Sequence, residues 1–281
     1  MRINDSREKA ADYAAKRLQA QRNIDSRVDE ILYDVACKIY TICEKYDSAF
    51  VKNKQMKAEI DTVVEEAKAL IWEYENEYAK AAETILEDDN GITAAYLAAA
   101  HNGKTFKQRQ NVYVKRFVKD MMKIYYAGVV LGTTSGVIRN AMEKQYRSPY
   151  MKNGLVQSAI SARSGVHVYN LPYKDAEKKA REVRETLETP SYGRGIQPEA
   201  YAQIQKNVKD TLALAWSEED HDAAIRAGAK GFWVLRGSSY PCIECQSHVG
   251  WLHKMDDDAP PYHSHCVCFC VYTLNEENPE L

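Results

Sequence analysis

Two long stretches in the first half of the chain place apolar residues every three or four positions, which is the pattern of an amphipathic α-helix. The first stretch covers residues 24–49 and the second covers 56–85, followed by a turn-forming Asp-Asp-Asn-Gly sequence at 88–91. The polar segment 47–55 is short enough to reverse the chain, as connections between bundled helices usually are. The pattern predicts an antiparallel helical hairpin that packs within the molecule, in preference to a coiled coil with a partner.

More helix is predicted downstream. The stretch 92–101 is rich in alanine, and 104–125 alternates cations with apolar residues at helical spacing. A short charged helix is predicted over 175–187, and one or two helices over 201–228. The segment 188–198, rich in proline and glycine, has the composition of a loop or linker.

Three glycines recur every four residues in the middle of the chain, at Gly128, Gly132 and Gly136. This spacing permits another helix to approach closely, although the pattern is weak support outside membranes. A loop made of glycines is the equal alternative.

Composition places the chain among globular proteins. It has 281 residues, of which 45% are hydrophobic and 28% are charged, and this length suits one to three domains. The longest uncharged stretch near the middle, 124–138, has 15 residues, whereas a membrane-spanning helix needs about 20. The charged N-terminus shows no secretory signal. We therefore expect a protein of a reducing cytosol with no membrane span.

The net charge of -2 hides a strong partition along the chain. Residues 1–103 hold 14 Lys/Arg against 20 Asp/Glu, 104–163 hold 12 against 2, and 164–281 hold 12 against 18. The basic segment 104–163 can neutralise phosphates of DNA or dock an acidic partner, and a solvated surface face is the plain alternative. No motif that reads bases accompanies it.

Five of the seven cysteines crowd into the last 40 residues, and their spacing is that of a structural zinc site. A Cys-x-x-Cys pair is followed, after 17 residues, by a His-x-x-Cys-x-Cys sequence. The candidate metal ligands are Cys242, Cys245, His263, Cys266 and Cys268. An odd cysteine count without an export signal argues against a disulfide framework.

A tetrahedral site takes four of these five side chains. We favour Cys242, Cys245 and His263 with either Cys266 or Cys268, and a set of four thiolates stays open. Such a closed site leaves no position for a water ligand, so it predicts structural stapling and not hydrolysis. Buried free thiols are the alternative.

Other polar residues near the cluster are not predicted to bind metal. We interpret three further histidines as surface or outer-shell residues, and the acidic run 256–258 as a solvated loop. These histidines are His248, His253 and His265. Alternation over 266–270 predicts a strand with its sulfurs on one face.

The C-terminal sequence resembles the phage Mu F-like minor head protein (head morphogenesis) family. The resemblance begins at about Lys209 and is carried by Trp233, Cys242-x-x-Cys245, Gly250, an acidic loop, and Pro260-Pro261-x-His263-x-x-Cys266-x-Cys268. Ser264-His265 stands where the family usually has Pro-Asn, Val267 replaces its usual arginine, and Gly250 lies one place later than expected.

The resemblance implies a phage or prophage structural protein, made in the host cytoplasm and built into the virion head in few copies near the portal. Portal, scaffold or coat proteins are its implied partners, with packaged DNA as a further contact of 104–163. A free-standing zinc-ribbon protein that binds nucleic acid is the alternative. An enzyme, such as a nuclease using His263 and His265 or an ADP-ribosyltransferase, has less support, because no established catalytic motif is present. We therefore predict no catalytic or cofactor-binding residues.

The predicted fold is mainly α (α+β): a helical hairpin or bundle followed by a small zinc-stapled β element built from 232–236, 250–254 and 267–273. The predicted domains are an acidic helical region (1–103), a basic helical region (104–188) and a Mu F-like C-terminal domain (199–281).

Overall fold

The computed structural model describes most of the chain. The described residues are 4–86, 95, 98–101, 103–145, 154–161, 178, 181–182, 185–187, 200–263 and 266–274.

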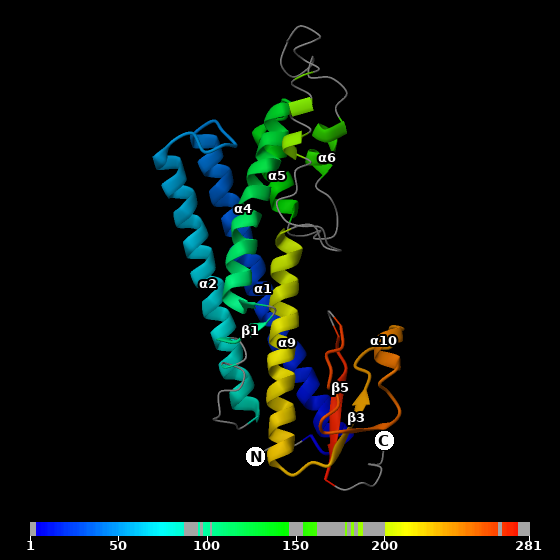
Figure 1. The fold of residues 1–281 in the computed structure, drawn as a ribbon. Helices are drawn as coiled ribbons and strands as arrows, with labels where there is room; N and C mark the ends of the chain where they lie inside the picture. Colours follow the sequence, from blue (N-terminus) through cyan, green and yellow to red (C-terminus); the bar gives the residue numbers. More distant parts are fainter. Residues whose placement is uncertain are drawn as a thin grey trace. The chain divides into compact units, whose positions relative to one another are not determined.

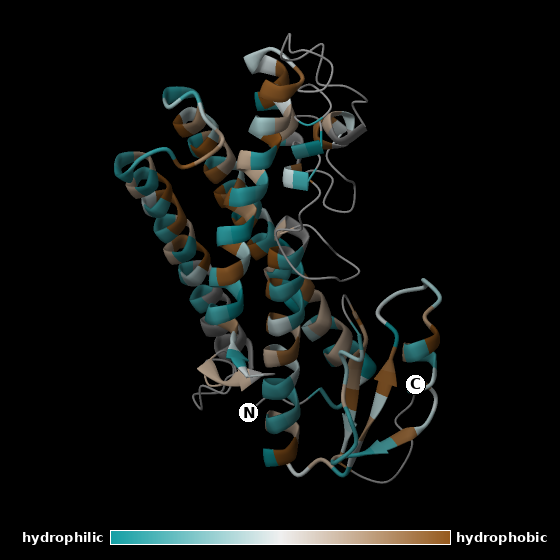
Figure 2. Ribbon diagram, turned by 45° about the horizontal axis from the view of Figure 1, so that its top comes forward, coloured by the Kyte–Doolittle hydropathy of each residue, from teal (hydrophilic) through white to brown (hydrophobic). Residues whose placement is uncertain are grey.

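The protein is mainly helical with a small sheet near its C-terminus, as the sequence predicts (Figure 1). The helices are α1 (Arg7–Lys45), α2 (Lys54–Leu86), α4 (Phe106–Val130), α5 (Ser135–Gln145), α6 (Gly154–Ser161), α9 (Ala200–Arg226) and α10 (Ile243–Gln246). The strands are β1 (Ala100–His101), β2 (Lys104–Thr105), β3 (Gly231–Leu235), β4 (Leu252–Lys254) and β5 (Phe269–Thr273). Hydrophobic and hydrophilic residues alternate within the turns of the long helices, as their sequence spacing requires (Figure 2).

The chain forms two compact units, and each is assembled from separate pieces of sequence. The first unit comprises Met1–Arg27, Trp72–Arg109 and Gln205–Leu281, and the second comprises Val28–Ile71 and Gln110–Ile204. Pieces of α1, α2, α4 and α9 therefore occur in both units. The division at 1–103, 104–188 and 199–281 stays a prediction, and its linker at 188–198 lies outside the described residues.

The predicted helical hairpin is present in the second unit. Lys38 pairs with Glu66 at 3.0 Å and Lys45 with Glu59 at 2.7 Å, so α1 and α2 run antiparallel. Most of the described apolar positions of both stripes are buried, although Leu70 is 40% exposed and the neighbouring Ile71 is buried in its place. The helix α1 begins at Arg7, well before the stripe recognised from Ile24 onward.

The end of the alanine-rich stretch differs from its prediction, whereas the described residues 95 and 98 are helical as predicted. Ala100 and His101 pair with Thr105 and Lys104 as an antiparallel ladder, although a helix was expected through His101. A tight turn at Gly103, with φ of 75°, permits this pairing, and turn geometry here outweighs the helix propensity of alanine. Most of 92–99 lies outside the described residues, as does most of the helix predicted over 175–187.

The C-terminal sheet forms part of the first unit. Its strands have the order β4-β3-β5 and are all antiparallel, with Phe232 opposite both His253 and Tyr272. The single helix α9 leads into it and ends at Arg226. Gly228 follows with a φ of 82°, the left-handed conformation that suits glycine after a helix. Ala224 of α9 packs into the same small core as Phe232 and Tyr272. We call residues 231–274 the C-terminal knot.

The three spaced glycines have three different roles in the second unit. Gly128 of α4 faces Ile138 of α5 so closely that a Cβ atom would collide with that side chain. Gly132 has a φ of 63° in the turn between the helices. Gly136 lies in the first turn of α5 with open space around it. Close helix packing therefore explains one glycine and the turn explains another.

We predict that Gly128→Ala lowers the free energy of unfolding by about 1–3 kcal/mol, because the added methyl overpacks the contact with Ile138. Gly136→Ala is the matched control, and it should be neutral or stabilise by up to about 1 kcal/mol, since alanine favours helix and the site has space. Chemical denaturation of both variants checks this. Equal stability of the two variants would contradict the packing assigned to Gly128.

Candidate metal centre

The first pair of candidate ligands is held by a single turn of helix. Cys242 caps the N-terminus of α10, where its Sγ accepts a hydrogen bond from the backbone N–H of Cys245 at 3.4 Å. The backbone N–H of Gln246 then bonds to the Cys242 carbonyl at 3.0 Å. This turn brings both sulfurs to the same side, which is why a Cys-x-x-Cys spacing can grip one ion.

The second group comes from the segment that precedes β5. The backbone N–H of Cys266 bonds to the His263 carbonyl at 3.1 Å, and this turn directs the imidazole and the Cys266 thiol toward α10. The strand β5 begins at Phe269, so Cys266 and Cys268 precede it and the strand expected from residue 266 starts later. Gly237 permits this segment to pass close by, since a Cβ there would collide with the Val267 carbonyl.

All five predicted ligands converge. His263 Nε2 lies 3.2 Å from the Cys242 Sγ and 2.9 Å from the Cys245 Sγ, and the Cys245 and Cys266 sulfurs are 3.7 Å apart. Within each of two overlapping groups the donor atoms lie within 4.8 Å of one another. The groups are Cys242, Cys245 and His263, and Cys245, Cys266 and Cys268.

This donor set fits a small soft cation. A tetrahedral ion with Zn–S bonds of about 2.3 Å separates two sulfur ligands by about 3.8 Å, close to the spacing of Cys245 and Cys266. One group has two thiols and an imidazole, the other has three thiols, and neither has a carboxylate. Such ligands select zinc or related metals over magnesium and calcium. The cluster can therefore hold a metal ion.

The sulfurs also belong to a hydrophobic core. Cys245, Cys266 and Cys268 are at most 5% exposed and pack with Phe232 and Tyr272. All seven cysteines are free thiols. A buried ionised thiolate is costly unless it is paired, so this core places charge where only a cation or strong hydrogen bonds can stabilise it.

The thiols differ in acidity. A hydrogen bond from the Cys268 thiol lowers the pKa of Cys266 to about 5, while the Cys266 thiolate and burial raise the pKa of Cys268. Burial raises the pKa of Cys245 to about 12. The backbone N–H of Cys245 lowers the pKa of Cys242. A metal ion bound at this cluster would have to displace the protons of its thiol ligands.

Cys270 lies apart from these groups. It is the fifth cysteine of the C-terminal cluster, and its side chain is fully buried in β5, which raises the pKa of its thiol well above the ordinary value. It belongs to neither of the two donor groups found among the described residues.

The remaining histidines pack as aromatic residues. The His253 ring is 1% exposed, stacks on Phe232 with centroids 4.9 Å apart, and bonds through Nε2 to the His248 carbonyl. His248 stacks on Tyr262 at 3.7 Å. Neither joins the donor groups, and His265 lies outside the described residues. In the acidic run 256–258 the first and last residues are exposed.

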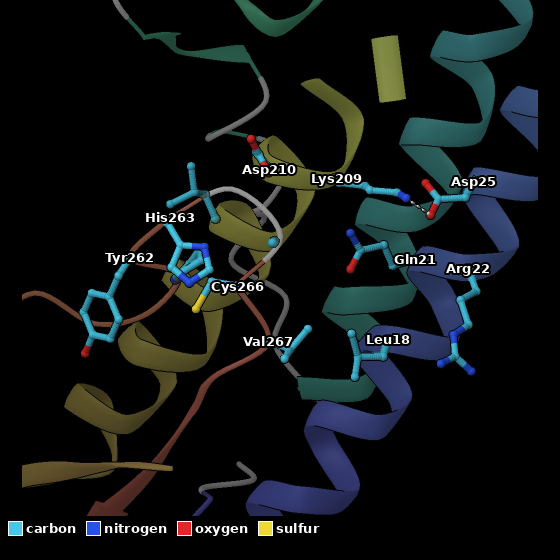
Figure 3. Close-up of a pocket in the computed structure, with 13 residues that line it drawn as sticks. Leu18, Gln21, Arg22, Asp25, Lys209, Asp210, Tyr262, His263, Cys266 and Val267 are labelled. Atoms are coloured by element: carbon cyan, nitrogen blue, oxygen red, sulfur yellow. Dashed lines mark ion pairs between the residues drawn. The ribbon is translucent and has the colours of Figure 1, made fainter. Parts of the chain in front are cut away.

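A cavity of about 390 Å³ adjoins the cluster. His263, Cys266 and Val267 line it on the side of the knot, and Leu18 lies across from them on α1 (Figure 3). Lys209 of α9 and Asp25 of α1 form an ion pair of 3.0 Å at this cavity. The donor cluster is therefore bounded by the two long helices of the first unit as well as by the sheet.

No family model matches this sequence, and no curated protein or solved structure is significantly similar to it. Function is therefore inferred from the residues and from the geometry of the knot. None of the helices that the structure describes has the uninterrupted apolar length needed to span a bilayer.

One residue of this site was missed from the sequence. Arg17 of α1 is 4% exposed and its Nη2 donates to the Cys268 carbonyl at 3.3 Å. Extending the spacing of three and four backward from Ile24 reaches Arg17 and then Ala14 and Ala10, all of which are buried. A cation at a core position of the stripe was the signal that could have found it.

We predict that the purified chain binds one zinc ion and that Cys245→Ser weakens binding by more than the roughly 10- to 100-fold cost of losing an outer-shell partner. Zinc must displace thiol protons, so affinity should fall as the pH is lowered. Competition with a chromophoric chelator measures both effects.

Cys37→Ser is the control for this experiment, because Cys37 lies in the second unit, outside the donor groups. Its zinc affinity should equal that of the unmodified chain. Equal zinc affinity of the Cys245→Ser and Cys37→Ser variants would refute the metal centre.

Proposed function

We propose that this chain is a minor head protein of a phage or prophage, of the Mu F-like head morphogenesis type, and that its C-terminal knot is a structural zinc staple. The observation that carries the proposal is the convergence of the Cys-x-x-Cys and His-x-x-Cys-x-Cys side chains in one buried cluster. These are the residues on which the family resemblance rests.

A staple suits the architecture of the knot. The strand β4 has three residues, and β3 and β5 have five each, which is small for a sheet that must be stable by itself. A zinc ion bound by both donor segments would cross-link the turn at α10 to the start of β5. Its binding free energy would then become folding free energy of the knot.

A non-enzymatic role is part of the proposal. Four protein ligands complete a tetrahedron and leave no position for an activated water. A nuclease based on His263 and His265 would need His263 open to a substrate, whereas its Nε2 lies between Cys242 and Cys245. This position supports structural use of the imidazole.

The proposed partners are portal, scaffold or coat proteins, with the chain made in the host cytoplasm and then built into the head. The proposal expects the gene to lie beside one for a portal protein. Tagged chain co-expressed with that portal protein should recover it, and a zinc-loaded, folded chain that recovers no portal, scaffold or coat protein would overturn this placement. Cys245→Ser should recover less, because the knot loses its staple.

Contact with DNA is a second candidate function, favoured by one face of α4. Lys115 and Lys119 are one turn apart and exposed, and neither forms an ion pair with the residues that the structure describes. Asp120 is the sole acidic residue in the helix, and its carboxylate accepts a hydrogen bond from the backbone N–H of Ala200. This face of the second unit therefore presents two exposed cations that form no ion pair with the described residues.

Other cations of 104–163 are already engaged in the structure. Arg109 turns inward in the first unit, where it donates to Asn207 and Thr211. Lys107 lies over the Trp72 ring at 4.8 Å. Arg139 pairs with Glu143 at 2.8 Å. Three cations of the basic segment are thus engaged by other side chains, whereas Lys115 and Lys119 on the exposed face of α4 form no ion pair with the described residues.

We predict that the chain binds duplex DNA with salt-dependent affinity and that the double variant Lys115→Glu/Lys119→Glu lowers the slope of log affinity against log salt by about 1.8, since each phosphate contact contributes about 0.9. Fluorescence anisotropy at several salt concentrations measures the slope. The control is Lys54→Glu/Lys57→Glu, an equal charge change at exposed sites of α2 in the same unit. Equal slopes for the two double variants would exclude the α4 face as the DNA-binding surface.

A further inference from the structure

Arg17 is a buried cation without a carboxylate partner among the described residues. Its side chain is 4% exposed, and its one hydrogen bond runs from Nη2 to the Cys268 carbonyl at 3.3 Å. Its Nε is buried and has no hydrogen-bond partner. Buried arginines are almost always paired, because an unpaired charge in the interior is costly.

The acceptor places this cation beside the metal centre. Cys268 is one of the candidate ligands, and the carbonyl that Arg17 contacts belongs to its backbone.

The net charge of a metal-thiolate centre would give the Arg17 cation a partner. Zinc bound by three thiolates and one neutral imidazole carries one net negative charge, and zinc bound by four thiolates carries two. That charge would be buried in the core formed by the cysteines, Phe232 and Tyr272. One buried arginine balances the three-thiolate centre.

We propose that Arg17 is the counter-charge of the metal-thiolate centre, so that metal binding in the knot is coupled to docking of the N-terminal part of α1. The inference rests on the metal site proposed above. Arg17 acts through the charge and the backbone of the ligand segment, so it is a positioning residue and not a ligand.

A further contact joins the same part of the chain to the knot. The Asn4 carbonyl accepts a hydrogen bond from the backbone N–H of Tyr272, in the edge strand β5, at 2.8 Å. The Tyr13 hydroxyl donates to the Trp216 carbonyl of α9, outside the knot, and the centroids of the two rings lie 5.6 Å apart. Loss of order in the knot would thus remove the partners of Asn4 and Arg17, while the contact of Tyr13 with α9 would remain.

Hydrogen exchange on the unmodified full-length chain tests the coupling directly. Removal of zinc with a chelator should increase exchange in residues 7–20 together with residues 242–273. Residues 30–45, which continue α1 in the second unit, provide an internal control and should keep their protection. Chelation that exposes the knot and leaves 7–20 protected would overturn the inference.

The zinc affinity of substituted chains tests whether the positive charge of Arg17 stabilises the metal centre. Arg17→Met, which keeps an apolar stem of similar length, is expected to weaken zinc binding by about 10- to 100-fold, as loss of an outer-shell partner does. Arg17→Lys keeps the charge and should lose clearly less. The control Lys16→Met removes an exposed cation from the neighbouring position and should have no effect.

The results separate this inference from the proposed metal site. A chain that binds no zinc would overturn both. A chain that binds one zinc, with Arg17→Met and Lys16→Met of equal affinity, would overturn the role of Arg17 and leave the metal site standing. Equal losses in Arg17→Lys and Arg17→Met would likewise overturn the counter-charge. Should Arg17→Met fail to fold, the exchange experiment on the unmodified chain still decides.

Discussion

The C-terminal knot is built around the candidate metal donors, whose buried sulfurs lie within its small hydrophobic core. Three short strands and a single helical turn bury little apolar surface, and the sulfurs occupy the centre of what they bury. Ala224 of α9, Phe232 of β3 and Tyr272 of β5 all pack into this centre. The end of α9 and the strands β3 and β5 are thus positioned by their packing around the donors.

Much of this arrangement could be predicted from the sequence because it is local. The strand β3 lies one residue before its predicted segment, and β4 and β5 each begin two residues later than predicted and end where predicted. The helical hairpin could be predicted from the period of the apolar residues, since a spacing of three and four residues is the pattern of an amphipathic helix. The five candidate donors could be predicted from the spacing of their residues. Two residues between Cys242 and Cys245 are enough for the helical turn of α10 that brings the two sulfurs together.

The parts that could not be predicted are long-range. Arg17 lies 251 residues from its acceptor, and no local pattern connects them. The inward turn of Arg109 toward α9 was hidden for the same reason, because by sequence it is one cation among twelve in the basic segment. The helix predicted through His101 was wrong for a different reason. There the pairing of two residues on each side of the turn at Gly103 outweighed the strong helix propensity of alanine.

The composition of the first unit has a consequence for synthesis. Its N-terminal piece, Met1–Arg27, packs with residues that are translated more than 200 positions later, among them Trp216 and Tyr272. The start of α1 therefore leaves the ribosome long before its partners exist and keeps its buried face exposed until the knot has emerged. A chain interrupted before β5 would lack Tyr272, so the N-terminal segment would lose the hydrogen bond that the Asn4 carbonyl accepts.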